Sequence, residues 1–176
     1  MKPGEPMPDF VAESMRGKMV RSPCLLGAPT LIMFHHYAKC AVCNERIHEL
    51  RQELPRIQAE TGLQALFVCH SDRNRLLTEF GDARLPFDVI PDPTRRLYAL
   101  FCVIRSVQLA TRSLAFGTIP GGAGSEPSGM NPADVFVDAD GDIVAAHYGE
   151  FLGDTWSVDT IRRLAETYSS RVAANE

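Results

Sequence analysis

The sequence has no long hydrophobic run and no excess of basic residues. None of its apolar stretches approaches the roughly 20 residues that span a bilayer. Lysine and arginine together number 18 against 22 aspartates and glutamates, which gives a net charge of −4 at pH 7. Binding to nucleic acid or to an anionic membrane requires concentrated positive charge, so the composition argues against both kinds of partner.

The number of cysteines does not suggest a disulfide framework. The chain has five cysteines, an odd number that makes a poor disulfide framework. The first twenty residues carry prolines and acids where a signal peptide would have its apolar segment. We therefore expect a soluble, cytoplasmic protein whose cysteines are reduced at rest. The length of 176 residues and the hydrophobic fraction of 45% predict a single globular domain over residues 1–176.

Glycine and proline mark two irregular segments. Residues 1–29 contain enough of both to exclude a long helix, so an irregular N-terminal arm with a short hairpin or edge strand is expected there. Residues 117–131 contain five glycines and two prolines, which predicts a flexible loop.

Strand and helix patterns alternate between these segments. Short apolar runs predict strands at 31–36, 63–69 and 87–90, and Asp140-Gly141 predicts a hairpin of 134–138 with 142–148. The order β-α-β-α-β-α-loop-β-β-α predicts the α/β class, with a mixed β-sheet flanked by helices.

Four helices are expected from apolar spacing and end signals. The first covers 43–61, bends at Pro55 and stops at Gly62. The others are a helix capped by Ser71 that runs through Phe80, one opened by Asp92, and one capped by Ser157 that runs to Val172. Their expected inward residues are Leu76, Leu77 and Phe80 in the second helix, Leu97, Leu100, Phe101 and Ile104 in the third, and Ile161, Leu164, Ala165 and Tyr168 in the last.

The candidate reactive site is the pair Cys40 and Cys43, which follows the first predicted strand and opens the first long helix. Free N–H groups and partial positive charge at a helix N-terminus favour a thiolate, and Lys39 adds positive potential. Cys40 is the expected nucleophile. Cys43, one helical turn away, can attack a mixed disulfide or sulfenic acid on Cys40 and close a local disulfide.

Four more residues are candidates for shaping this site. His36 could tune the thiolate, and Tyr37 and Trp156 could shape the site or be ordinary surface and core residues. Pro132 precedes a predicted strand, where a cis peptide bond would present backbone to the cysteine pair. Of the other cysteines, Cys69 and Cys102 are expected as small buried hydrophobes, whereas Cys24 could be exposed and a distant resolving role for it stays open.

Metal binding is the alternative use of these cysteines. Cys40 and Cys43 with either His35 or His36 would form a Cys₂His set, because neighbouring strand residues point to opposite faces. This set lacks the fourth ligand of a structural zinc site. We therefore assign neither a metal nor a cofactor on the sequence alone.

The motifs above, taken in order, resemble the thioredoxin-like superfamily and, more narrowly, peroxiredoxin-like proteins of the AhpC/TSA group. The resemblance covers about residues 7–165 and rests on five segments: MPDF (7–10), LIMFHHYAKCAVCNERIHEL (31–50), LPFDVIPDPTRRLYALF (85–101), NPADVFVDADGDIVAAHYGE (131–150) and GDTWSVDTI (153–161).

The resemblance implies a thioredoxin-like fold, redox-active Cys40 and Cys43, and Pro132 beside them. The implied activity is reduction of a peroxide or a disulfide, with thioredoxin, glutaredoxin or a small thiol as the reductant; homodimers are common in this group. Two family features are missing. Peroxiredoxins carry Pro-x-x-x-Thr-x-x-Cys, but these Pro and Thr positions are His36 and Cys40 if Cys43 attacks, or Met33 and Tyr37 if Cys40 attacks. In the thioredoxin pattern, Lys39 replaces Trp and Val42 replaces Pro.

The leading hypothesis is a peroxiredoxin-like thiol oxidoreductase that uses a Cys40–Cys43 dithiol/disulfide cycle. Three alternatives remain open at this point: a general thiol-disulfide oxidoreductase without peroxidase activity, a Cys/His metal-binding or redox-sensing module, and a fold relative whose role is protein interaction.

Overall fold

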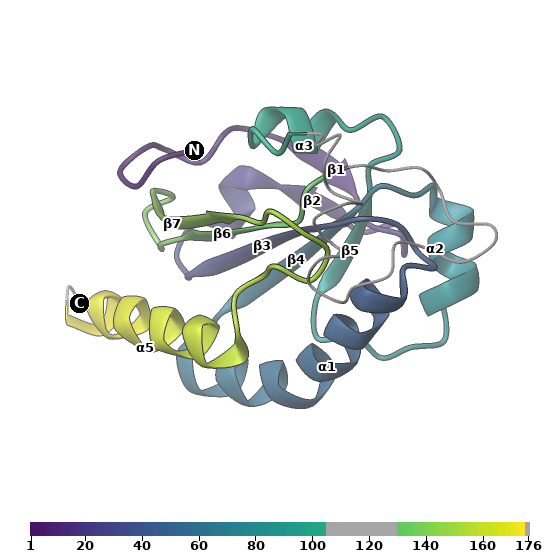
Figure 1. The fold of residues 1–176 in the computed structure, drawn as a ribbon. Coiled ribbons are helices and arrows are strands. Elements are labelled where there is room, and N and C mark those ends of the chain that lie inside the picture. Colours follow the sequence, from purple (N-terminus) through teal and green to yellow (C-terminus); the bar gives the residue numbers. More distant parts are fainter. Residues whose placement is uncertain (105–129, 175–176) are drawn as a thin grey trace.

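A five-stranded mixed sheet forms the centre of the protein (Figure 1). The computed structural model describes residues 1–104 and 130–174, with side chains of the last helix described up to residue 169. The sheet has the order β5-β4-β3-β6-β7, with bounds β3 Thr30–His35, β4 Gln64–Cys69, β5 Asp88–Pro91, β6 Ala133–Val137 and β7 Ile143–Tyr148. Strands β3, β4 and β5 are parallel, whereas β6 and β7 are antiparallel to their neighbours. The predicted α/β class and mixed sheet are confirmed.

Helices cover both faces of this sheet (Figure 1). Helices α1 (Ala41–Thr61), α2 (Arg73–Phe80) and α5 (Val158–Ala174) contribute to the core on one face. Helix α3 (Arg96–Leu100) and the N-terminal segment cover the other face. The N-terminal segment contains the two-stranded sheet of β1 (Val11–Glu13) and β2 (Met19–Arg21) and the 3-10 helix η1 (Ser22–Leu25), which agrees with the expected short hairpin.

The middle of strand β3, residues 31–34, is apolar because it contributes to both cores. Leu31 and Met33 point into the core under α1, whereas Ile32 and Phe34 point into the core under α3. Side chains of a strand alternate between faces, so a central strand covered on both sides contains few polar residues. Packing on both faces holds β3 in place, and the chain leads from the end of β3 into the candidate site.

Helix α1 begins and ends with the signals in its sequence. Cys40 is its N-cap, and the helix continues past Pro55. Gly62 ends it in the left-handed conformation, with φ of 70°, and its N–H donates to the Gln58 carbonyl. The first cysteine of the pair is therefore the residue whose side chain faces the free N–H groups of the first turn.

Two predicted helix details are wrong. The N-cap of α2 is Asp72, whose side chain accepts from the Arg75 N–H. Ser71 instead accepts a hydrogen bond from the Ala38 N–H through its hydroxyl, which holds the chain beside the cysteine pair. Leu77, expected to face inward, is 37% exposed, because Leu76 and Phe80 already occupy the buried face of this short helix.

Helix α3 begins at Arg96, later than predicted, and it also ends early. The Asp92 carboxylate accepts from the N–H groups of Arg96, Leu97 and Tyr98. The helix ends at Leu100, and Cys102 turns the chain with φ of 58°. As a result, Ile104 is 65% exposed and Leu100 is 37% exposed, contrary to the inward positions expected for both. The predicted loop at 117–131 lies outside the described residues, apart from 130 and 131.

Candidate active site

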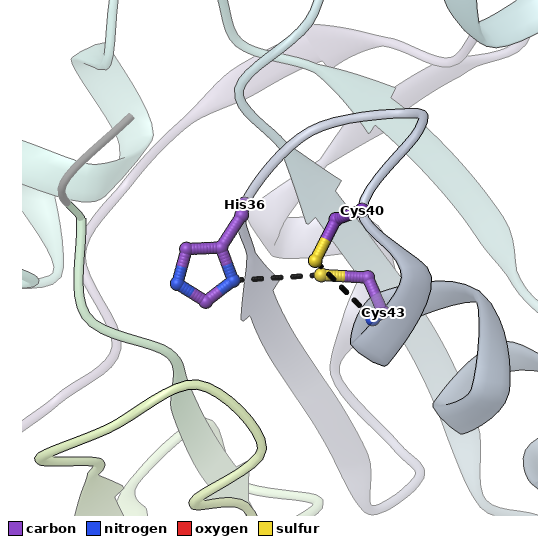
Figure 2. Close-up of side chains that lie close together, drawn as sticks. All are labelled: His36, Cys40 and Cys43. Carbon is purple, nitrogen blue, oxygen red and sulfur yellow. Dashed lines mark hydrogen bonds between the residues drawn. The ribbon is translucent and has the colours of Figure 1, made fainter. Parts of the chain in front are cut away.

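The two cysteines and His36 lie together where β3 leads into α1 (Figure 2). The Cys40 Sγ accepts a hydrogen bond from the Cys43 backbone N–H at 3.4 Å. The Cys43 Sγ lies 3.4 Å from the Nδ1 of His36. The Nδ1 and the two sulfurs all lie within 4.8 Å of one another. The structure therefore brings together the cysteine pair and the histidine that the sequence singled out.

The pKa values of the two thiols are shifted in opposite directions. The pKa of Cys40 is lowered to about 5, mainly by the hydrogen bond from the Cys43 thiol, with smaller contributions from His36 and the Cys43 N–H; burial opposes them. Burial raises the pKa of Cys43 well above its ordinary value, and the neighbouring Cys40 raises it further. The first turn of α1 has no acidic residue to oppose this thiolate. Negative charge therefore belongs on Cys40 and the proton on Cys43.

Both cysteine side chains are buried, each with 2% of its surface exposed. A groove of about 610 Å³ adjoins the pair, and its wall includes His35, His36 and Cys43. Cys40 does not line this groove. A reactant in the groove therefore meets the Cys43 side of the pair first.

The segment around Trp156 also lines the groove, and hydrogen bonds fix this segment in place. Arg46 of α1 donates through Nη2 to the Trp156 carbonyl at 2.5 Å. The Trp156 N–H donates to Oδ2 of Asp134, a residue of β6, at 2.7 Å. Gly153, with φ of 89°, lies against Val42, and a Cβ on it would approach the Val42 side chain to 3.1 Å. Hydrogen bonds to α1 and β6 therefore fix this wall of the groove in place.

Arg46 and Asp134 were missed by sequence reasoning. Arg46 carries a charge that would ordinarily face solvent, but only 8% of its surface is exposed. The signal was present, because Arg46, Leu50 and Leu54 recur at four-residue steps and therefore share the buried face. Asp134 is fully buried, and the residues on either side of it in β6 are apolar. A buried carboxylate requires polar partners, and the sequence alone does not show which residues these are.

Of the other predicted site residues, Tyr37 is buried and packs against both cysteines. Lys39 is exposed, and its effect on the thiolate stays a prediction. Pro132 immediately precedes Ala133, which pairs with Phe34, so it lies beside the end of β3 that leads to the cysteines. Among the described residues every peptide bond is trans, so the cis bond considered at Pro132 is not present.

The remaining cysteines differ in exposure. Cys69 is buried as expected, and burial raises its pKa. Cys102 is exposed, which corrects the prediction of a buried hydrophobe; the turn that ends α3 directs it outward. Cys24 is exposed and lies near Gln64 at the start of β4, at the opposite end of the parallel strands from the pair.

Comparison with known proteins defines the family. The model of the AhpC/TSA family matches residues 3–146. The chain belongs to the AhpC/TSA family. A comparison with curated protein sequences found no significant match.

Solved structures similar to this AhpC/TSA protein have thioredoxin-like folds. Peroxidoxin BcpB from Mycobacterium tuberculosis superimposes with a TM-score of 0.67 at 18% identity, covering 100% of this chain and 99% of that chain. A yeast mitochondrial 1-Cys peroxiredoxin gives 0.71 at 12% identity, covering 94% and 75%. A Chlorobium tepidum protein proposed to be the thiol:disulfide interchange protein DsbE gives 0.67 at 15% identity, covering 96% and 99%.

The predicted thioredoxin-like fold is confirmed by these similarities, and membership of the AhpC/TSA family supports a thiol-dependent oxidoreductase. In the part of the chain that the structure describes, no helix combines the length and apolar character needed to cross a membrane.

Proposed function

We propose that this protein reduces hydroperoxides through a Cys40–Cys43 dithiol/disulfide cycle. The observation that carries the proposal is that the two sulfurs lie within 4.8 Å of each other at the start of α1, with the pKa of Cys40 lowered and that of Cys43 raised. A thiolate is the nucleophilic form of cysteine, and a protonated partner within reach can take over once the thiolate has reacted. The family assignment supports the same chemistry.

The proposed cycle has two steps on the protein. The Cys40 thiolate attacks one oxygen of the hydroperoxide, the O–O bond breaks, and an alcohol leaves after taking up a proton, so that Cys40 becomes a sulfenic acid. Cys43 then attacks the Cys40 sulfur, a disulfide forms, and water leaves. One hydroperoxide and two thiols thus give one alcohol, one water and one disulfide. Two electrons from thioredoxin, glutaredoxin or a small thiol restore the pair.

The assignment of Cys40 as the attacking residue competes with the peroxiredoxin motif. If Cys40 attacked in that motif, the proline position would be Met33, which lies inside the central strand β3, where proline would remove a ladder hydrogen bond. If Cys43 attacked, the position would be His36, which follows the strand. Access through the groove also favours Cys43, whereas thiolate character favours Cys40. We assign the attack to Cys40 because only the thiolate reacts at neutral pH.

Thiol-disulfide exchange without peroxidase activity is the second candidate. It is favoured by a specific observation, namely that neither register keeps the proline and threonine of the peroxiredoxin motif, whose hydrogen bonds would orient a peroxide. In this case the same Cys40 thiolate attacks a substrate disulfide, and Cys43 releases the reduced product. A cytoplasmic location and a homodimer are part of the proposal under either activity, and cell fractionation and light scattering test them.

The deciding experiment traps the intermediate. In Cys43→Ser, peroxide followed by a sulfenic-acid probe is expected to label Cys40, and in the unmodified chain peroxide is expected to give the Cys40–Cys43 disulfide by mass spectrometry. Cys24→Ser is the control, since this exposed thiol lies away from the pair. If peroxide labels neither cysteine and closes no disulfide while an aromatic disulfide substrate still reacts, the second candidate replaces the first.

A further inference from the structure

The cluster of His36, Cys40 and Cys43 has the composition of a soft-metal site. We propose that, in its reduced form, it binds one d¹⁰ cation, Zn²⁺ or Cu⁺, through the Nδ1 of His36 and the two sulfurs. These atoms lie within 4.8 Å of one another, and all three residues are buried (Figure 2). Thiolate sulfur and imidazole nitrogen are the ligands that both cations prefer.

The spacing of the donor atoms fits such an ion. With Zn–S of about 2.3 Å and Zn–N of about 2.0–2.1 Å, ligand atoms of a tetrahedral site lie roughly 3.5–3.8 Å apart. The Nδ1 of His36 and the Sγ of Cys43 are 3.4 Å apart. A small rotation of the side chains therefore accommodates the ion, without movement of β3 or α1.

For Zn²⁺, charge supplies a second reason. Cys43 is buried, so an isolated thiolate there would be costly. A divalent cation neutralises two thiolates in place, which allows both sulfurs to lose their protons without burial of net charge. In the described residues, the Nε2 of His36 has no hydrogen-bond partner, so His36 interacts with protein through Nδ1, the atom that points at the sulfurs.

The number of ligands distinguishes the two cations. Three protein ligands satisfy Cu⁺, whereas Zn²⁺ takes a fourth ligand. The groove of about 610 Å³ beside Cys43 and His36 can supply a water or a small thiol to that position. Zinc bound in this way would resemble an open site, with three protein ligands, rather than a closed structural one.

Metal binding and disulfide formation exclude one another, because the same two sulfurs serve both. Oxidation of the two thiolates by a hydroperoxide, with two protons taken up from solvent, yields the disulfide, an alcohol and water, and it releases the cation. The inference uses the residues of the proposed function but does not depend on turnover, so each can fail without the other.

The test loads the fully reduced chain, without oxygen, with zinc sulfate in one arm and a Cu⁺–acetonitrile complex in the other. Metal retained after gel filtration is counted by elemental analysis, and affinity is measured by competition with chromophoric chelators. Cobalt(II) in place of zinc reports thiolate ligation through its sulfur-to-metal charge-transfer absorption. We expect one ion per chain in at least one arm, and loss of that ion on treatment with hydroperoxide.

Variants separate this site from adventitious binding. His36→Gln keeps both thiols, and it is expected to weaken metal binding at least about tenfold, the loss found even for indirect partners of a ligand, while excess oxidant still closes the Cys40–Cys43 disulfide. Cys24→Ser is the matched control and is expected to retain the ion. Circular dichroism of each variant checks that it folds.

The outcomes are distinguishable. A chain that forms the disulfide but retains no ion in either arm overturns the metal site and leaves the proposed function in place. Equal loss of metal in Cys24→Ser and His36→Gln also overturns it, since the exposed thiol would then be the ligand. Retention of one ion in a chain that never forms the disulfide supports the metal site and contradicts the proposed function.

Discussion

At the scale of single residues, the hydrogen bond from the Cys43 thiol does most to lower the pKa of Cys40. The Cys40 sulfur also accepts from the Cys43 N–H, and the first turn of α1 contributes no acid. His36, which follows β3, completes the surroundings of both sulfurs. The acidity of Cys40 is therefore set by groups within the same short segment of the chain.

Alkylation of Cys40 tests this acidity. Because its pKa is about 5, labelling of Cys40 by an alkylating agent should rise around pH 5 and stay flat at neutral pH, whereas an ordinary thiol, with a pKa near 8.5, continues to rise. Burial is expected to keep the plateau rate below that of an exposed thiolate. Peptide-resolved mass spectrometry after timed labelling from pH 4 to pH 9 gives the profile.

His36→Asn provides the comparison. His36 lowers the pKa of Cys40, so the variant should move the Cys40 profile to higher pH and, for a shift of about one unit, reduce labelling at pH 6 by about 2-fold. A Cys40 profile that still climbs at pH 9 in the unmodified chain would contradict the assignment of the thiolate.

At the scale of elements, α2 shows how a tertiary contact changes a helix start. Ser71 and Asp72 are both good N-cap residues, but the Ser71 hydroxyl accepts from Ala38, 33 residues away. Asp72 is therefore the N-cap of α2.

Asp72→Ala should lower the free energy of unfolding by about 1 kcal/mol, measured by urea denaturation. Glu45→Ala, an exposed position on α1, is the control and should change it by less than about 0.5 kcal/mol. Equal losses in the two variants would show that Asp72 is not the cap.

The same reasoning explains which elements could be predicted. Strands β3 and β4 and helix α1 are visible in the sequence because apolar runs and four-residue spacing are local signals. The early end of α3 is not visible, because the apolar pattern continues through Ile104 while the chain turns at Cys102.

The candidate site, like the fold, was predictable only where the signals are local. The position of Cys40 and Cys43 follows from the strand-to-helix junction, which is local. The groove wall could not be predicted in this way. The residues that form it and hold it in place are Arg46 of α1, Asp134 of β6 and Trp156 of the segment before α5, and they meet only in the folded chain. Sequence thus identified the reactive pair but not the groove beside it.

At the scale of the whole molecule, Asp134 links the sheet to the groove wall and makes stability depend on pH. Burial raises the pKa of Asp134 from 3.8 to about 6. Between these values the folded state holds a proton that the unfolded state has lost, so the contribution of Asp134 to stability falls as pH rises from about 4 to about 6.

Asp134→Asn removes this titration and keeps an acceptor for the Trp156 N–H. Relative to the unmodified chain, the variant should gain stability as pH rises from 4 to 7, by up to about 3 kcal/mol for a shift of about two units. Urea midpoints at pH 4, 5, 6 and 7 measure the difference, which isolates Asp134 because all other groups are common to both chains. A difference that is constant across this range would show that Asp134 has no raised pKa.

The contrast between two exposed and three buried cysteines affects how oxidised samples are interpreted. Cys24 and Cys102 face solvent, whereas Cys40, Cys43 and Cys69 do not. A covalent dimer on a non-reducing gel would therefore report a link through Cys24 or Cys102 rather than through the Cys40–Cys43 pair. Replacing both by serine gives a chain in which any band of doubled mass would have to come from the interior thiols.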